Sequence, residues 1–241
     1  MLSLRQTWYG SCCNSGSRIL VHTDIAERFT QAVIERSKQV PVGDPLHPDM
    51  KVGAITSETQ LNIIETAIKN AKTEGASVRL GGARISTTQG MYFQPTIITN
   101  VEPSMSIAHE EVFGPVLSIL NFSTLEEAIT IANQTSYGLS AAVWSKDIDI
   151  CLQAAKGIHT GTIWINNFLE GFPELPFGGF KASGIGRELS QCRRRLYRTE
   201  NYSITYRRKN SLVAYSVLMK NFFKLKLERS KRKQYDKDFR Y

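Results

Sequence analysis

Two adjacent cysteines near the start of the chain are the residues best suited to covalent chemistry. Cys12 and Cys13 stand in the stretch CCNSGSR, where small residues permit a tight turn with exposed amides and Arg18 leads into an apolar run. A cysteine becomes a nucleophile when its thiolate is favoured by N–H groups or positive charge and is accessible. Inert cysteines outnumber catalytic ones about ten to one. The residues around the pair therefore make each cysteine a candidate nucleophile and do not decide between Cys12 and Cys13.

An acidic pair and a glycine-rich stretch are the next candidates. Glu110 and Glu111 precede Phe113 in EEVFGPV. A glutamate before a strand can accept two ribose hydroxyl hydrogen bonds, and a nearby phenylalanine can hold a flat ring. Without a relative to compare, a solvated pair that opens a turn is favoured. The glycines of PFGGFKASGIGRE suit folding as well as a site, and GIG lacks the remaining features of a dinucleotide fingerprint.

The histidines and the cysteine count favour structural roles and a reducing compartment. We expect surface or capping positions for His22, His47, His109 and His159, and no His and Cys spacing resembles a metal site. Four cysteines are too few for a disulfide framework. With no recognisable leader and no apolar run long enough to span a bilayer, the sequence predicts a cytoplasmic protein without a membrane partner.

The elements that must position these residues alternate along the chain. Strand patterns fall at 17–22, 77–82, 93–100, 114–122, 139–145 and 160–167, and helix patterns at 24–40, 57–74, 125–134 and 147–157. We expect the first helix to be capped by Thr23 or Asp24, the second by Ser57 with Gln60, and the third by Ser123 with Glu126. This alternation predicts an α/β fold with a mostly parallel sheet covered on both faces.

The C-terminal segment differs from the rest in charge and pattern. Residues 191–241 contain 16 Lys and Arg against 4 Asp and Glu, whereas residues 1–190 contain 14 against 18. We expect no continuation of the sheet here, and a basic-faced helix within 214–233 is the one element suggested. A basic tail can bind nucleic acid, but no binding module is recognisable. Disorder, or translation in a shifted reading frame over 192–241, explains the composition without nucleic acid.

Three segments resemble the aldehyde dehydrogenase superfamily. The family segment GQxCxxxxR places its cysteine five residues before the arginine, which selects Cys13 over Cys12. EEVFGPV resembles the family's cofactor-contact motif, and GTIWINN with ELPFGGFKASGIGRE, within 161–188, resembles its closing segment. The resemblance runs from about residue 10 to 188 with the motifs in family order, so it implies an aldehyde dehydrogenase catalytic domain at 1–190 and a divergent tail at 191–241.

The resemblance also implies roles for particular residues. Cys13 corresponds to the nucleophile, with its own N–H as an oxyanion donor, and the cofactor is NAD or NADP. The implied catalytic residues are Cys13 and Glu188, the implied cofactor contacts are Glu111 and Phe113, and the implied substrate contacts are Trp164, Asn166 and Phe168. Glu188 would position or admit water.

The implied reaction oxidises an aldehyde to its acid through a cysteine thiohemiacetal and thioester. The stretch FLEGFPELPFGG resembles betaine-aldehyde and aminoaldehyde members, which suggests a cationic aldehyde. Intact family members form homo-oligomers and carry a Rossmann-like cofactor domain ahead of the cysteine. Because that domain supplies further catalytic groups, we expect these 241 residues alone to be inactive. The alternatives are a non-catalytic remnant or subunit-interaction module, and, third, a nucleic-acid binder acting through the tail.

Overall fold

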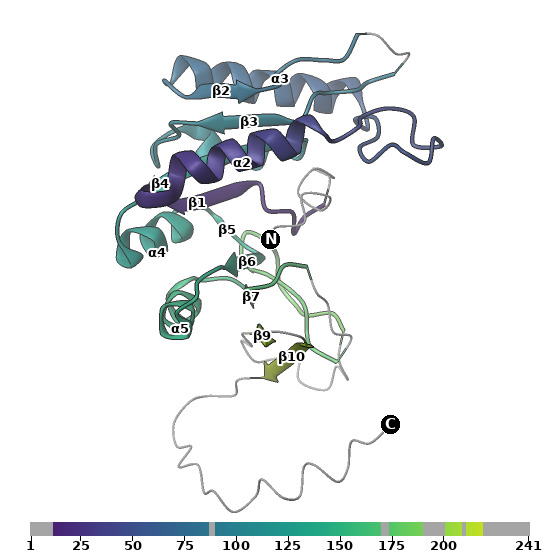
Figure 1. Cartoon of the computed structure of the whole chain (residues 1–241). Coiled ribbons are helices and arrows are strands. Elements are labelled where there is room, and N and C mark those ends of the chain that lie inside the picture. The colour runs from purple at the N-terminus through teal and green to yellow at the C-terminus, as the bar shows by residue number, and fades with distance from the viewer. Residues whose placement is uncertain (1–11, 87–89, 170–173, 190–200, 209–210, 219–241) are drawn as a thin grey trace, which may run out of the picture.

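The computed structural model describes five stretches of the chain. These are residues 12–86, 90–169, 174–189, 201–208 and 211–218, the last two as backbone strands (Figure 1). Strands and helices alternate through most of this length, as the sequence predicts.

The first sheet has four strands in the order β1-β4-β3-β2. β1 (Arg18–His22) and β3 (Thr96–Thr99) both pair in parallel with the central β4 (Val116–Phe122), while β2 (Ser77–Leu80) pairs antiparallel with β3. The predicted α/β class with a mostly parallel sheet is therefore confirmed.

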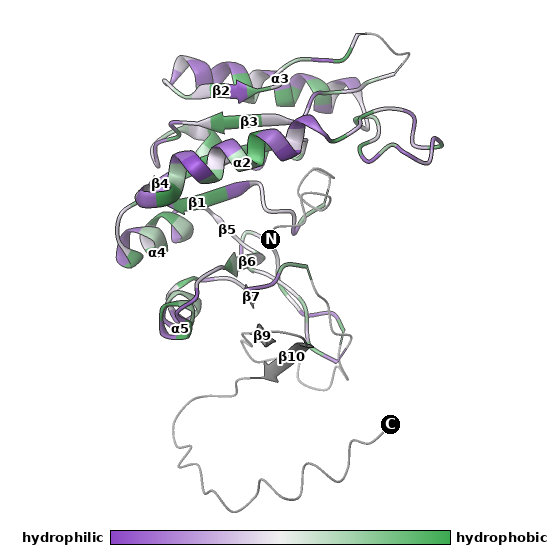
Figure 2. Cartoon of the chain, viewed as in Figure 1, coloured by the Kyte–Doolittle hydropathy of each residue, from purple (hydrophilic) through white to green (hydrophobic). Residues whose placement is uncertain are grey.

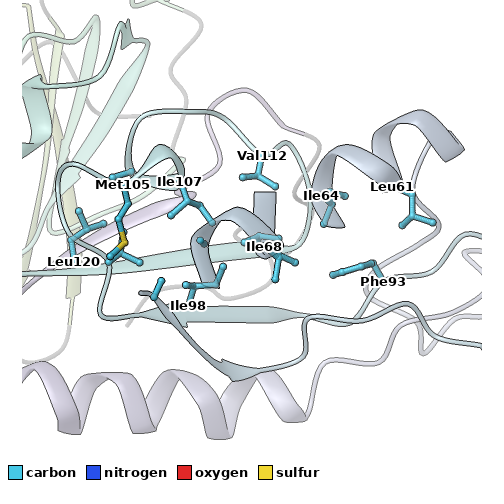
Figure 3. Packing of buried hydrophobic residues seen from close by; sticks show 14 of the residues in the cluster. Leu61, Ile64, Ile68, Phe93, Ile98, Met105, Ile107, Val112 and Leu120 are labelled. Carbon is cyan, nitrogen blue, oxygen red and sulfur yellow. The ribbon is translucent and has the colours of Figure 1, made fainter. Parts of the chain in front are cut away.

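Two helices cover opposite faces of this sheet. Alternate β4 residues point to opposite faces, so Leu117 packs with the α2 (Ala26–Lys38) residue Ile34, and Leu120 packs with the α3 (Glu58–Thr73) residue Ile64. Figure 2 shows hydrophobic residues interspersed with hydrophilic ones along both helices, and Figure 3 shows the α3 side gathered around Ile68. A fully buried Ile or Leu contributes about 1.5–3 kcal/mol, so these two layers stabilise the site's supporting sheet.

The second sheet has the order β10-β9-β7-β6. Its strands are β6 (Ser140–Val143), β7 (Thr162–Ile165), β9 (Asn201–Arg208) and β10 (Ser211–Leu218), with α5 (Ile148–Gly157) packed against β7. A small pair is formed by β5 (Tyr137–Gly138) and β8 (Phe180–Lys181). In the chain, α4 (Leu125–Asn133) follows β4 of the first sheet and precedes β6 of the second sheet (Figure 1).

Two predicted helix starts are wrong by one or two residues. His22, not Thr23 or Asp24, caps the first turn, because its ring Nδ1 accepts a hydrogen bond from the Asp24 N–H; this turn is the 3₁₀ helix η1 (Thr23–Ile25), and α2 starts after it. α4 is capped by Thr124, which accepts from the Glu127 N–H at 3.2 Å, rather than by Ser123 with Glu126.

The basic tail continues the second sheet, contrary to the sequence expectation. β9 pairs in parallel with β7, and β10 pairs antiparallel with β9. The stretches NYSITYRR and SLVAYSVL are rich in β-branched and aromatic residues, which favour strands over the helix expected from residue 214. The expected helix is therefore wrong for 214–218, and its remainder lies outside the described residues. The division of domains at 190 and 191 stays a prediction.

Candidate active site

Cys13 occupies a tight turn at the entrance to β1, as the sequence predicts. The Ser15 N–H donates to the Cys12 carbonyl at 2.9 Å, which closes the turn over Cys13. The Cys12 thiol donates to Asn14 Oδ1 at 2.9 Å. Both cysteines are exposed, so a reagent can reach the Cys13 thiol from solvent.

The cysteine turn and the loop with Phe113 approach the same edge of the first sheet. Arg18 pairs in parallel with Ser118, and the Ser118 N–H donates to the Ser17 carbonyl at 2.9 Å. Cys13 and Phe113 each lie five residues before these paired residues. Because parallel neighbours start at the same edge, the strand register brings the two segments to one side of the molecule.

α3 supports the Phe113 loop through one side chain that the sequence analysis missed. Ser57 caps the helix as predicted, accepting from the Gln60 N–H. The Gln60 side chain donates instead to the carbonyls of Val112 and Phe113, at 3.1 and 3.2 Å. Phe113 has a φ of 41°, an unusual left-handed value for a bulky residue, which needs such support. A glutamine three residues after a cap gives no sequence signal for this second role.

Glu111 lies at a pocket of about 380 Å³ between α3 and the loop before β4. The lining residues are Thr59, Asn62, Ile63, Thr66, Ala67, Asn70, Glu110, Glu111 and Val112. Partial burial raises the pKa of the Glu111 carboxyl. Phe113, which follows in the same loop, is 36 % exposed. The cofactor contacts of Glu111 and Phe113 stay predictions.

The closing segment places one aromatic ring against the cysteine turn. A Cβ atom at Gly16 would lie 3.5 Å from the Phe168 ring, so Phe168 packs directly beside this turn. Trp164 is only 3 % exposed and meets Phe168 edge to face, with ring centroids 5.6 Å apart. Trp164 therefore supports Phe168 from the interior, while half-buried Phe168 packs against Gly16.

Asn166 and Glu188 are placed mainly through backbone contacts. Asn166 Oδ1 accepts from the Ser145 N–H at 3.0 Å, so its amide oxygen holds the loop after β6. Glu188 and Phe177 exchange two backbone hydrogen bonds of 2.8 Å, and Glu188 is exposed. The structure places Phe168 against Gly16 of the cysteine turn. The site roles of Cys13, Phe113, Phe168, Asn166 and Glu188 stay predictions.

Two of the four histidines, His22 and His47, cap turns. His22 and His47 accept through Nδ1 from the N–H groups of Asp24 and Asp49, which confirms their capping roles. Across the described stretches, no group of three or more His, Cys, Asp or Glu residues could hold a metal ion. No helix of those stretches has the length and apolar character to cross a bilayer.

Comparison with known proteins gives a consistent match over most of the chain. The model of the aldehyde dehydrogenase family matches residues 6–199. An aldehyde dehydrogenase of Enchytraeus buchholzi is 45 % identical over 179 residues, which are 74 % of this chain and 36 % of that protein. The peroxisomal aminoaldehyde dehydrogenase 1 of Pisum sativum is 43 % identical over 76 % of this chain and 36 % of its own length. The chain thus spans little more than a third of these relatives.

Solved structures share both sequence and fold with the chain. An NAD-dependent aldehyde dehydrogenase from Sinorhizobium meliloti is 44 % identical with a TM-score of 0.75, covering 78 % of this chain and 38 % of its own. A betaine aldehyde dehydrogenase from Staphylococcus aureus in complex with NAD+ is 39 % identical with a TM-score of 0.75, covering 93 % and 42 %. Together with the three ordered motifs, these matches mean that the chain belongs to the aldehyde dehydrogenase family, a family of NAD(P)-dependent enzymes.

Proposed function

We propose that this chain supplies the catalytic thiol and the nicotinamide-side contacts for oxidation of an aldehyde to its acid. The observation that carries the proposal is the shared edge of β1 and β4, where the register brings the segments of Cys13 and Phe113 together. Phe168 beside the cysteine turn adds a wall for the substrate. The family membership supplies the reaction class.

The proposed reaction begins when the Cys13 thiolate attacks the aldehyde carbon and forms a carbon–sulfur bond. The Cys13 N–H donates to the resulting oxyanion, and one such donor contributes about 10²–10³ in rate. A nicotinamide dinucleotide held by Glu111 and Phe113 would supply the hydride acceptor, and loss of the hydride from this carbon would leave a thioester on Cys13. Water, positioned by Glu188, attacks the thioester, releases the acid and restores the thiol.

Glu111 and Phe113 are the residues proposed to hold the cofactor. Glu111 accepts hydrogen bonds from the ribose hydroxyls, and Phe113 restricts the nicotinamide ring. The raised pKa of Glu111 reflects a carboxyl that has lost part of its water, which strengthens hydrogen bonds to it. Relatives with bound NAD+ support the dinucleotide class, and the choice between NAD and NADP is left to experiment.

A cationic aldehyde is the proposed substrate. Relatives named as betaine aldehyde and aminoaldehyde dehydrogenases support this choice. Half-buried Phe168 presents an aromatic ring beside Gly16 of the cysteine turn, and a cation over such a ring gains about 0.5–2 kcal/mol. Trp164 and Asn166 then act by fixing Phe168 and the neighbouring loop. A cytoplasmic location stays a prediction, since one relative is named as peroxisomal.

Acylation by p-nitrophenyl acetate tests the nucleophile without the cofactor. Attack by Cys13 forms the acetyl thioester and releases p-nitrophenolate, and peptide mass spectrometry locates the acetyl group. We expect Cys13 to react faster than Cys12, Cys12→Ser to keep the reaction and Cys13→Ser to lose it. Slow and equal reaction of both cysteines would contradict the proposal and favour the non-catalytic remnant.

The same preparation tests turnover. With an aldehyde and NAD+ or NADP+, we expect no reduced cofactor to form from residues 1–241 alone, because the matched residues are only 36 % of the length of each of these relatives. Sustained formation of reduced cofactor would overturn this part of the proposal while leaving the role of Cys13 intact.

A further inference from the structure

Arg18 carries a half-buried guanidinium that joins two segments remote from each other in the chain. Its Nη1 donates to the Ala108 carbonyl at 2.9 Å, and its Nη2 donates to the Ala132 carbonyl at 3.4 Å. Burial lowers the pKa of this guanidinium, and no carboxylate of the described residues forms an ion pair with it. The strand that follows the Cys13 turn is thereby tied both to the segment before Glu111 and to the end of α4.

Lys181 reaches the same end of α4 from the closing segment. Its Nζ donates to the carbonyls of Asn133 and Thr135, at 2.9 and 3.0 Å. Partial burial lowers the pKa of Lys181, and the nearby positive charge of Arg18 lowers it further. Two cations of different segments therefore lie close together around one helix terminus.

The helix terminus explains how these two positive charges are accommodated. The last carbonyls of a helix have no partner within it and form the negative end of its dipole. The last turn of α4 contains no basic residue of its own, so Arg18 and Lys181 supply the donors from outside. The planar guanidinium of Arg18 presents two Nη groups in a fixed fork, and these donate to carbonyls of two different segments.

Neutral side chains extend the connections of this terminus. Asn133 donates to the Gly157 carbonyl and accepts from the His159 N–H, both at 2.7 Å, which ties α4 to the end of α5. Thr135 Oγ1 donates to the His109 carbonyl at 3.4 Å, next to the segment that Arg18 also holds. Segments of all three motifs thus meet at residues 132–135.

We propose that Arg18 and Lys181 are positioning residues that fix the three motif segments relative to one another through the C-terminal end of α4. Arg18 fixes the strand after the Cys13 turn against the 108–113 segment, and Lys181 fixes the closing segment to the same point. The catalytic importance of these segments rests on the proposed function. The test of their coupling needs neither cofactor nor turnover.

Residue-resolved amide exchange tests this coupling in Lys181→Met, Lys181→Arg and the matched control Lys51→Met. Lys51 also donates to a backbone carbonyl, that of Pro48, in a loop away from the site. The Ala182 amide reports locally on β8, the Ser15 amide on the cysteine turn, and the Glu110 amide on the loop before Phe113.

We expect Lys181→Met to raise exchange at Ala182, Ser15 and Glu110 by roughly tenfold, since a hydrogen bond to a charged donor is lost. Lys181→Arg should restore most protection, and Lys51→Met should change none of the three. Acceleration confined to Ala182 would overturn the coupling, and so would equal acceleration of core amides such as Ile98, which reports global destabilisation. A wild-type Cys13 that fails to acylate would count against the proposed function but would leave this exchange pattern unaffected.

Discussion

Glu65 and Glu111 are carboxylates whose surroundings shift their pKa in opposite directions. A hydrogen bond from Arg84, at 2.8 Å, lowers the pKa of partly exposed Glu65. Partial burial raises the pKa of Glu111. Glu65 lies in α3, and Glu111 lies at the pocket that α3 lines. Two carboxylates in one part of the fold therefore have pKa shifts of opposite direction.

We expect the variants Glu65→Gln and Glu111→Gln to have opposite pH dependence of stability. Folded Glu65 binds its proton less tightly than the unfolded chain does, so its stabilisation is present above the ordinary carboxyl pKa and is lost as pH falls through the lowered value. Folded Glu111 holds its proton more tightly, so its favourable contribution is present at low pH and is lost as pH rises through the raised value.

Urea unfolding from acid to neutral pH measures both effects. At neutral pH Glu65→Gln should be less stable than wild type and Glu111→Gln slightly more stable, and both differences should shrink in acid. Differences of the same sign for the two variants would contradict this assignment of causes.

At the scale of the elements, spacing alone leaves adjacent cap positions undecided. Ser123 and Thr124 each have a glutamate three residues later, at Glu126 and Glu127. The structure uses Thr124, and the Glu127 carboxylate accepts from the Ser123 N–H at 2.8 Å. Because both choices satisfy the sequence rule, the start of α4 was predictable only to within one residue.

Alanine substitution separates these two caps. Thr124→Ala removes the acceptor for the Glu127 N–H and should lower the free energy of unfolding by about 1 kcal/mol. Ser123→Ala keeps the backbone N–H that binds Glu127, so it should cost clearly less. Urea denaturation of both variants measures the difference, and a larger loss from Ser123→Ala would show that the cap lies one residue earlier.

Elements that follow simple periodicity were predictable from the sequence, whereas features that depend on tertiary contacts were not. β4 is a mostly apolar run, and α2 and α3 have apolar residues at helical spacing, so their hydrophobic patterns indicate a buried strand and two amphipathic helices. The support of Phe113 by Gln60 and of α4 by Arg18 and Lys181 joins residues far apart in the chain, so no local pattern encodes it. Among the site residues, the cysteine turn was predictable locally, whereas choosing Cys13 over Cys12 required the family spacing.

At the scale of the whole molecule, the basic tail combines two properties. Residues 201–208 extend the sheet of β7, so part of the tail belongs to the folded unit. Residues 219–241 contain 9 Lys and Arg against 3 Asp and Glu and lie outside the described residues. Deleting only residues 219–241 therefore removes positive charge from the tail while keeping the strands that belong to the folded unit.

Deletion of residues 219–241 should weaken polyanion binding and leave the fold and Cys13 reactivity unchanged. The wild-type chain should be retained on heparin and should bind DNA without sequence preference, with an affinity that falls linearly on a logarithmic salt scale, because its positive charge neutralises phosphates. The deletion variant should elute from heparin at lower salt than the wild type, unfold at the same urea concentration and acylate Cys13 at the same rate. DNA binding that distinguishes between sequences at fixed salt would instead favour a selected nucleic-acid function for the tail. A deletion that slowed Cys13 acylation would place residues 219–241 within the catalytic unit.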